Sequence, residues 1–357
     1  TFSKIYYLQK EKTSFMKEFS ISSKEAGQRM DKFLAKYLNK APKSFFYKMM
    51  RKKNITLNGK KAVGNEQLKQ GDVIKLFLAE ETIENFIDHS QFSKKKASSA
   101  RKQTAGKKVQ LDILYEDEAA VFINKPVGML SQKASPTDTS LVEYFIDYLL
   151  ENGKITEEEL HTFHPSVCNR LDRNTSGIVA AGKTLQALQG LSEMFRDRTL
   201  KKYYLCLVKG QVKENQRIHG YLVKNEKTNK VTVSQKKPAE QTKDGKEASA
   251  IDTEYKVLAR NRETTLLEVH LITGKTHQIR AHLASIGHPI AGDYKYGNRS
   301  FNDALKKEYG LRSQLLHAYR LEFPENCEGD IKQLSGKIIK APVPVLFEQI
   351  CKAQGVM

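Results

Sequence analysis

The sequence predicts an α+β protein built from two folded parts, and three observations lead to this prediction. The chain has 357 residues, which is more than one hydrophobic core usually organises. Strand-like and helix-like patterns are mixed along it. A basic stretch that is poor in apolar residues interrupts these patterns. We therefore expect a small module at residues 16–80, a basic flexible linker at 81–108 and a larger catalytic domain at 109–357.

The first part has the pattern of a small α+β module. Apolar residues recur at helical spacing over residues 30–38, and a second, basic helical stretch covers residues 43–53. Asn58-Gly59 is a strong hairpin-turn signal, and Gly71-Asp72 precedes a strand-like stretch. The expected order is therefore two helices followed by a short hairpin.

The linker separates this module from the rest of the chain. Residues 89–110 contain many Lys and Arg residues, several Ser and Ala residues and no acidic residue. Such a segment lacks the apolar surface that would offset the entropy of ordering it, so we expect it to be flexible. Apolar segments return near Val109, and the Lys-rich segment 224–249 is expected to be a hairpin with an exposed loop. Residues 1–15 precede Met16 and take no part in the functional argument.

The charge of the chain points to a polyanionic partner. There are 60 Lys and Arg residues against 41 Asp and Glu residues, which gives a formal net charge of +19. A strongly positive surface attracts nucleic acids or anionic membranes. No stretch approaches the roughly 20 apolar residues that cross a bilayer, and no basic amphipathic helix stands apart from the folded pattern. Nucleic acid is therefore the expected partner.

Cysteines and histidines give no sign of a metal site or of secretion. The four cysteines are isolated from one another, without the paired spacing of zinc sites or redox motifs. His277 and His282 are five residues apart, which does not match the H-E-x-x-H arrangement of a helix-borne metal site. Nothing resembles the apolar core of a signal peptide. We expect a cytoplasmic protein with reduced thiols and no bound metal.

One polar segment could prepare a reactive carboxylate. Asp172 is flanked by Arg170 and Arg173 in a polar turn that leads into the apolar stretch 178–181. Nearby positive charge favours the ionised carboxyl group that a nucleophile needs. A structural salt bridge would explain the same residues, and residue types alone favour that explanation. The segment is Asn169-Arg170-Leu171-Asp172-Arg173-Asn174-Thr175-Ser176-Gly177.

The same region satisfies the phosphate-loop pattern G-x-x-x-x-G-K-[ST] between Gly177 and Thr184. That loop must follow a buried strand, whereas the residues before Gly177 are polar and the strand lies between the two glycines. A helix does follow the motif, as a phosphate loop requires, so half of the required context is present. Because the strand is in the wrong place, we nevertheless expect that the segment does not bind a nucleotide.

Further motifs follow one another in a fixed order. Lys125-Pro126-Val127-Gly128 precedes the Asp172 segment, and a tyrosine-containing strand and a basic motif follow it. Together they resemble the RluA-type family of RNA pseudouridine synthases over residues 110–347, with Asn169 where that family often has His. The later motifs are Lys202-Tyr203-Tyr204-Leu205-Cys206-Leu207-Val208-Lys209-Gly210, Thr273-Gly274-Lys275-Thr276-His277-Gln278-Ile279-Arg280-Ala281-His282-Leu283, Gly287-His288-Pro289-Ile290, Gly292-Asp293, Tyr296-Gly297 and Leu316-His317-Ala318.

This resemblance implies a catalytic domain with a largely antiparallel mixed β-sheet flanked by helices around a central cleft. It also implies roles for single residues. Asp172 would be the nucleophile, and Arg280 would pair with it and keep it charged. Tyr204 would lie against the uracil and exchange a proton. Tyr204 is preferred to Tyr203 because it stands six residues before Gly210, and neighbours on a strand face opposite sides. Since the reaction is redox-neutral, no cofactor is expected.

Basic residues at two places are candidate RNA contacts. By the resemblance, Arg170 would fill the stack that the target nucleotide leaves, although pairing with an acidic residue would also explain it. Arg173 and Lys202 lie in the matched motifs and are assigned to RNA as well. The module at 16–80 resembles the alpha-L RNA-binding module of ribosomal proteins and tyrosyl-tRNA synthetases. Its one-signed cluster would attract phosphates, with a solvated helix face as the alternative. This cluster is Lys43, Lys48, Arg51, Lys52 and Lys53.

The sequence thus predicts an RNA pseudouridine synthase that acts on structured RNA as a monomer, without a membrane partner. The N-terminal module favours large-subunit ribosomal RNA. Two alternatives remain open, namely the same chemistry on transfer RNA and a non-catalytic RNA-binding or ribosome-assembly protein. Whether Asp172 attacks the sugar or the uracil ring also remains open.

Overall fold

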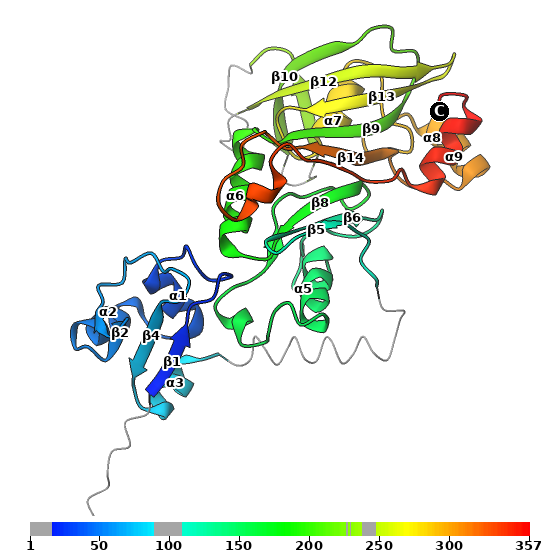
Figure 1. The fold of residues 1–357 in the computed structure, drawn as a ribbon. Helices are drawn as coiled ribbons and strands as arrows, with labels where there is room; N and C mark the ends of the chain where they lie inside the picture. The colour runs from blue at the N-terminus through cyan, green and yellow to red at the C-terminus, as the bar shows by residue number, and fades with distance from the viewer. Residues whose placement is uncertain (1–15, 89–108, 226–227, 229, 238–247) are drawn as a thin grey trace, which may run out of the picture. The chain divides into compact units, whose positions relative to one another are not determined.

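The computed structural model describes residues 16–88, 109–225, 228, 230–237 and 248–357. The chain divides into two compact units (Figure 1). The N-terminal unit takes the chain up to Val109 together with Ile155–His164, and the C-terminal unit takes Gln110–Lys154 and Pro165–Met357. Most of the predicted linker, from residue 89 to residue 108, lies outside the described residues.

The N-terminal unit has a four-stranded antiparallel sheet in the order β1-β4-β2-β3. Its core contains Met30, Phe33 and Leu34, all at most 1% exposed, which explains the helical spacing of these residues. The hairpin at Asn58-Gly59 has positive φ angles at both positions, as a two-residue turn of this kind requires. The elements are β1 Met16–Ser20, α1 Met30–Tyr37, α2 Lys43–Arg51, β2 Ile55–Leu57, β3 Lys60–Lys61, β4 Val73–Phe77 and α3 Glu80–Phe86.

The boundaries of this unit differ from the predicted ones at two places. Helix α3 begins at Glu80, and Ile83 and Ile87 are buried in the same core as α1, so the module continues to residue 88. The segment Ile155–His164, predicted as part of the catalytic domain, is grouped with the N-terminal unit. There Lys24 Nζ lies 2.8 Å from an oxygen of Glu159. These contacts join residues more than 130 positions apart, so local sequence patterns could not reveal them.

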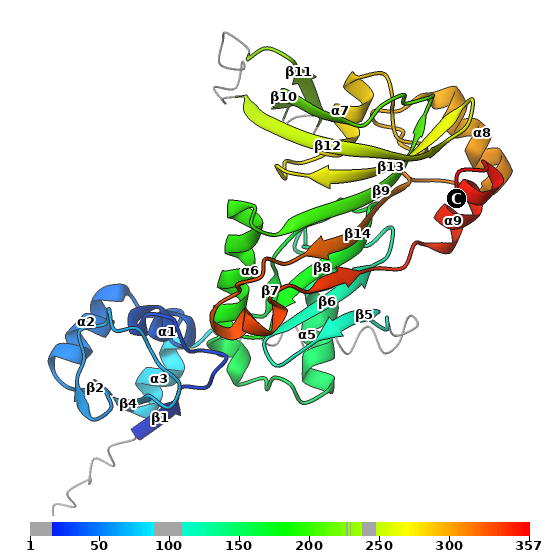
Figure 2. The same ribbon diagram turned by 45° about the horizontal axis from the view of Figure 1, so that its top comes forward.

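The C-terminal unit is built on one large mixed sheet, with strand order β11-β10-β12-β13-β9-β14-β8-β6-β5 (Figure 2). The pairing of β14 with β8 is parallel, and the other pairings between these neighbours are antiparallel. The predicted largely antiparallel sheet is therefore confirmed. The strands are β5 Ile113–Glu116, β6 Ala120–Lys125, β7 Ser166–Val167, β8 Ser176–Gly182, β9 Lys201–Lys209, β10 Gln216–Asn225, β11 Lys230–Ser234, β12 Ser249–Arg260, β13 Thr264–Leu271, β14 Leu316–Glu322 and β15 Ile338–Lys340.

Helices cover different parts of this sheet. Helix α6 packs with the 3-10 turn η2 against residues of β6 and β8, and α8 and α9 pack against residues of β9 and β13. Helix α7 contacts β10, β11 and β12. None of the helices in the described ranges is long and apolar enough to cross a membrane. The bounds are α5 Leu141–Glu151, α6 Leu185–Asp197, α7 Gln278–Ser285, α8 Arg299–Tyr309, η2 Gly329–Leu334 and α9 Val345–Ala353. The 3-10 turn η1 Glu159–His161 lies in the segment that is grouped with the N-terminal unit.

The segment with the phosphate-loop pattern is the buried strand β8 and the start of α6. A Cβ on Gly182 would lie 2.6 Å from the backbone of Leu188, so this glycine permits close packing of the strand and the helix. Lys183 Nζ is 2.9 Å from Glu116, and the Thr184 hydroxyl accepts a hydrogen bond from an N–H in the first turn of α6. These contacts occupy the groups that would otherwise hold a phosphate.

Candidate active site

The C-terminal unit contains a cavity of about 740 Å³. Its wall is formed by residues 130–134, by residues 168–175 between β7 and β8, and by residues 274–280 at the start of α7. Tyr204 on β9 and Phe195 on α6 contribute side chains to the same wall. The three predicted catalytic residues all line this cavity, as do Arg170, Arg173 and Lys202.

The loop that carries Asp172 is held at both ends. The Ser131 hydroxyl donates to the carbonyl of Leu171 and accepts from its N–H, with both distances at 3.0 Å. The N–H of Thr175 donates to the carbonyl of Asp172 at 3.0 Å, and Gln314 donates to the Thr175 hydroxyl at 3.2 Å. The backbone therefore fixes the position of a carboxylate whose side chain is 26% exposed.

Lys125 lies beneath this loop and is fully buried. Its ammonium group donates to the carbonyls of Pro126 and Met129 at 2.9 Å each and to that of Arg173 at 3.2 Å. Burial lowers the pKa of Lys125 to about 8, and the nearby Asp172 opposes this shift. The sequence predicted Lys125 only as part of a turn motif. A lysine at the end of the apolar strand β6, just before a proline, was the available signal.

Arg280 joins Asp172 to a second carboxylate. Its Nη1 donates to Asp172 Oδ2 at 2.8 Å, while Nε and Nη2 donate to the two oxygens of Asp293 at 2.7 and 2.9 Å. Burial alone would lower the pKa of Arg280, but Asp293 and Asp172 outweigh burial and raise it. The Asp293 side chain is only 1% exposed, so this bidentate pair fixes the guanidinium from behind. Asp293 was noted in a motif but was not predicted as a site residue.

The two neighbouring tyrosines of β9 face opposite ways. Tyr204 lines the cavity, and burial, with a further contribution from Asp172, raises its pKa. The ring of Tyr203 stacks on that of His270 with centroids 4.8 Å apart, and the guanidinium of Arg320 lies 4.0 Å from it. The structure therefore brings Asp172, Arg280 and Tyr204 together and separates Tyr203 from them.

His277 is a further residue of this site that the sequence considered only as a metal ligand. It precedes α7 in the left-handed conformation with φ 55°, and its Nε2 lies 3.9 Å from Asp172 Oδ2. Burial lowers the pKa of His277, and the Asp172 carboxylate opposes that shift. Its position three residues before Arg280 in the basic motif was the signal that could have drawn attention to it.

The predicted RNA contacts fall into two groups. Arg170 and Arg173 are exposed, and Arg173 Nε donates to the carbonyl of Gly128 at 3.1 Å. Lys202 is 7% exposed, and burial, followed by the charge of Arg198, lowers its pKa. The basic cluster of the module is exposed and belongs to the other unit. Within the described residues, no group of three or more His, Cys, Asp or Glu side chains could hold a metal ion.

Comparison with known proteins identifies the class of this fold and site. The family model for RNA pseudouridylate synthase matches residues 119–285. The solved structure of human RNA pseudouridylate synthase domain containing 4 shares the fold, with a TM-score of 0.52 and 24% identity over 75% of this chain and 98% of that one. The class is therefore the RNA pseudouridine synthases, which are isomerases that convert uridine to pseudouridine.

Curated relatives extend the similarity over most of the chain. Ribosomal large subunit pseudouridine synthase C of Vibrio parahaemolyticus is 34% identical over 309 residues, which cover 85% of this chain and 87% of the relative. The protein of the same name from Salmonella typhi is 32% identical over 336 residues, 93% of this chain and 96% of the relative. The chain belongs to the RluA-type family of RNA pseudouridine synthases, which confirms the predicted family and enzyme class.

Proposed function

We propose that this enzyme isomerises specific uridines of large-subunit ribosomal RNA, with Asp172 as the nucleophile. The names of the relatives support this substrate. The observation that carries the proposal is the ion pair between Asp172 and Arg280 in a cavity that also holds Tyr204. A cytoplasmic monomer that needs no cofactor is part of the proposal.

The geometry gives each of these residues a chemical task. Among the described residues, the Arg280 guanidinium donates to Oδ2 of Asp172, and we assign Oδ1 to the substrate. The uracil must leave carbon one of the ribose, turn, and form a new bond to it through ring carbon five. As the nucleophile, Asp172 is the group that stays bonded to the substrate while the uracil turns. Tyr204 offers a flat ring to the uracil and a hydroxyl that can exchange the proton of ring carbon five.

Basic residues supply the affinity for RNA. Lys202 lies on β9 two residues from Tyr204, so both side chains are on the same face of the strand, about 7 Å apart along it. That spacing suits a phosphate next to a uracil that stacks on Tyr204. Arg170 and Arg173 at the cavity take further phosphate or base contacts. The alpha-L-like module binds the RNA outside the site, through Lys43, Lys48, Arg51, Lys52 and Lys53.

The Asp172→Asn variant tests the nucleophile. Asparagine keeps the size of aspartate but cannot supply an anionic oxygen, so activity should fall by at least about 10³-fold while RNA affinity stays within about twofold. The assay is tritium release from RNA labelled at ring carbon five of uridine, accompanied by thermal melting and RNA binding. Substantial tritium release by the well-folded variant would contradict the assignment.

Mapping of pseudouridines in cells that lack the enzyme tests the substrate. We expect one or more positions of large-subunit ribosomal RNA to lose the modification and to regain it with the wild-type chain but not with Asp172→Asn. If transfer RNA loses pseudouridine instead, the proposed substrate is wrong although the chemistry is right.

A further inference from the structure

We propose that His277 is a further catalytic residue, and that its Nε2–H donates a hydrogen bond to a carbonyl oxygen of the target uracil. The inference rests on the proposed function, since it places the uracil between Asp172 and Tyr204. It assigns a chemical task to a side chain that lines the cavity but neither holds Asp172 directly nor packs in the core.

The position of the imidazole gives Nε2 access to the substrate. The side chain of His277 is 10% exposed and lines the cavity beside the nucleophile. Its Nε2 is 3.9 Å from Asp172 Oδ2, which is too far for a hydrogen bond, and that oxygen already accepts from Arg280. Nε2 therefore lies next to the Asp172 carboxylate but makes no hydrogen bond to it.

The contact with Tyr296 bears on which imidazole nitrogen of His277 carries the proton. The Tyr296 hydroxyl accepts a hydrogen bond from the N–H of Val231 at 2.9 Å, and the same oxygen lies 2.9 Å from His277 Nδ1. A hydroxyl oxygen can accept two hydrogen bonds, so the contact with Val231 does not by itself fix the direction. Among the described residues, however, Nδ1 is the acceptor within reach of the Tyr296 O–H, and we assign that O–H to Nδ1. A neutral imidazole that accepts at Nδ1 must carry its hydrogen on Nε2. With this assignment, the cavity has an N–H donor beside Asp172.

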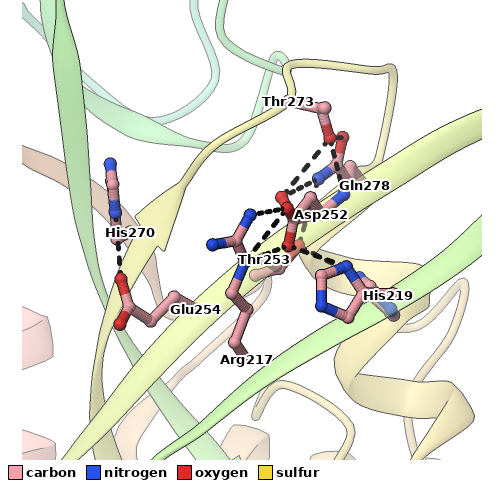
Figure 3. Close-up of polar contacts among 9 residues, drawn as sticks. Arg217, His219, Asp252, Thr253, Glu254, His270, Thr273 and Gln278 are labelled. Carbon is pink, nitrogen blue, oxygen red and sulfur yellow. Dashed lines mark hydrogen bonds and ion pairs between the residues drawn. The ribbon is translucent and has the colours of Figure 1, made fainter.

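The backbone around His277 is held in place despite an unfavourable conformation. A φ of 55° is uncommon for a residue other than glycine and costs energy unless the surroundings enforce it. The amide of Gln278 provides that restraint. Its Nε2 donates to the carbonyl of Asp252 and to the Thr253 hydroxyl at 3.0 Å each, and its Oε1 accepts from the Thr273 hydroxyl at 2.9 Å (Figure 3).

A donor at this place has a clear use in the reaction. When the bond between ribose carbon one and uracil nitrogen one breaks, its electron pair passes to the uracil ring and spreads onto the carbonyl oxygens. This holds whether Asp172 first bonds to the sugar or the ring. A fixed N–H that meets one of these oxygens stabilises the charge as it develops, and no proton needs to be transferred. The new carbon–carbon bond takes up this negative charge. Ring carbon five then loses its proton and ring nitrogen one gains one, which gives the neutral uracil of the product.

A matched pair of variants separates the donor from the shape of the residue. Glutamine and methionine are both unbranched, have similar volumes and bear the same cost at positive φ, but only glutamine can donate at the distance of Nε2. The full-length His277→Gln and His277→Met variants are compared with wild type by single-turnover tritium release. The RNA is total cellular RNA labelled at ring carbon five of uridine, taken from cells that lack the enzyme and fractionated into ribosomal and transfer RNA.

We expect His277→Met to lose about 10²-fold in the single-turnover rate constant at saturating enzyme with unchanged RNA affinity, and His277→Gln to stay within about tenfold of wild type. Equal losses in the two variants, or a change in RNA affinity alone, would overturn the proposal in favour of a shaping or phosphate-binding role. If only transfer RNA loses tritium with the wild-type enzyme, the proposed substrate fails, and the comparison of variants is made on transfer RNA.

Two further tests remain valid even if the His277→Gln and His277→Met variants fail to fold: another variant and a spectroscopic measurement. Tyr296→Phe removes the hydroxyl that fixes the tautomer and should lower kcat several-fold. Nitrogen-15 chemical shifts of the wild-type imidazole should show hydrogen on Nε2 at neutral pH. A hydrogen on Nδ1, or full activity of a folded Tyr296→Phe variant, would refute the proposed donor.

Discussion

Two neighbouring rows of side chains cross the same four strands of the large sheet, yet they have different surroundings. The cavity row contains Tyr204 and Val269, and the opposite row contains Tyr203 and His270 on the other face. Cross-strand pairing continues both rows to β10. The cavity row is Tyr204, Val269, Tyr255 and Gln216, and the opposite row is Tyr203, His270, Glu254 and Arg217.

In the opposite row the polar groups satisfy one another. His270 Nδ1 lies 3.1 Å from Glu254, and Arg217 binds both oxygens of Asp252, a neighbour of this row that also lies 3.3 Å from His219 Nδ1 (Figure 3). In the cavity row Tyr255 donates to Gln216 at 3.0 Å, whereas Tyr204 makes no side-chain hydrogen bond to any other described residue and faces the site. Residue type therefore does not distinguish the two tyrosines. Tyr204, which we propose to react, differs from Tyr203 by its unfilled hydrogen-bonding capacity near the Asp172 carboxylate.

The largest contrast should appear when each tyrosine hydroxyl is removed. Tyr204→Phe should lower kcat by about 10³-fold, because it removes a proton-exchanging group but keeps the ring. Tyr203→Phe should leave kcat within about threefold, since its ring contacts with His270 and Arg320 persist. Tritium release and melting temperature are measured for both. Equal losses of kcat in the two variants would contradict the different roles that we assign to Tyr204 and Tyr203.

A smaller contrast should appear in acid, because some histidines have carboxylate partners and His317 does not. His317 is fully buried, its Nδ1 lies 2.9 Å from the Ser176 hydroxyl, and burial lowers its pKa to about 4. Between pH 6.5 and 4 the unfolded chain therefore binds a proton that the folded chain does not. From this group the free energy of unfolding should fall by about 3 kcal/mol over that range as the pH decreases.

The pH dependence is measured by denaturant unfolding at several pH values. His317→Gln should flatten the acid slope, whereas His219→Gln should keep it, because the side chain of His219 is 67% exposed and lies beside Asp252. An unchanged slope in His317→Gln would show that another group is responsible.

The smallest effect is expected at Asp252, which binds Arg217 of the opposite row. Asp252→Asn weakens its pair with Arg217, whose side chain is 54% exposed, and should cost only about 1 kcal/mol of unfolding free energy. Activity should stay within about twofold, since Gln278 bonds to the backbone carbonyl of residue 252 and not to its side chain. A much larger loss of activity, with stability kept, would mean that this face takes part in catalysis or RNA binding.

Much of the fold and part of the site could be predicted from local patterns. Strand alternation separated Tyr203 from Tyr204, and Asn58-Gly59 predicted the hairpin between β2 and β3. The family motifs predicted Asp172 and Arg280, which the structure brings to 2.8 Å although they are 108 residues apart. Physical reasoning on residue types alone did not favour Asp172 as a nucleophile over a structural ion pair.

The missed features depend on contacts that no local pattern records. The burial of Lys125 is invisible because lysines are usually exposed, and its three carbonyl partners come from two separate loops. In the sequence, Asp293 is indistinguishable from other aspartates in turns, because only the fold shows that it pairs with Arg280. The segment Ile155–His164 is grouped with the N-terminal unit, and its contacts there are with residues far away in sequence. The sequence alone therefore could not separate it from the catalytic domain.

The guanidinium of Arg280 pairs with both Asp172 and Asp293, and this arrangement affects how such an enzyme can acquire a different RNA substrate. Because Asp293 holds the guanidinium with two hydrogen bonds, Asp172 has its counter-ion in place before any RNA arrives. Binding of RNA then needs to deliver a uridine and not to assemble the chemistry. Exposed positions such as Arg170 and Lys48 can vary over evolution, or be redesigned, to accept a new RNA while the interior stays the same.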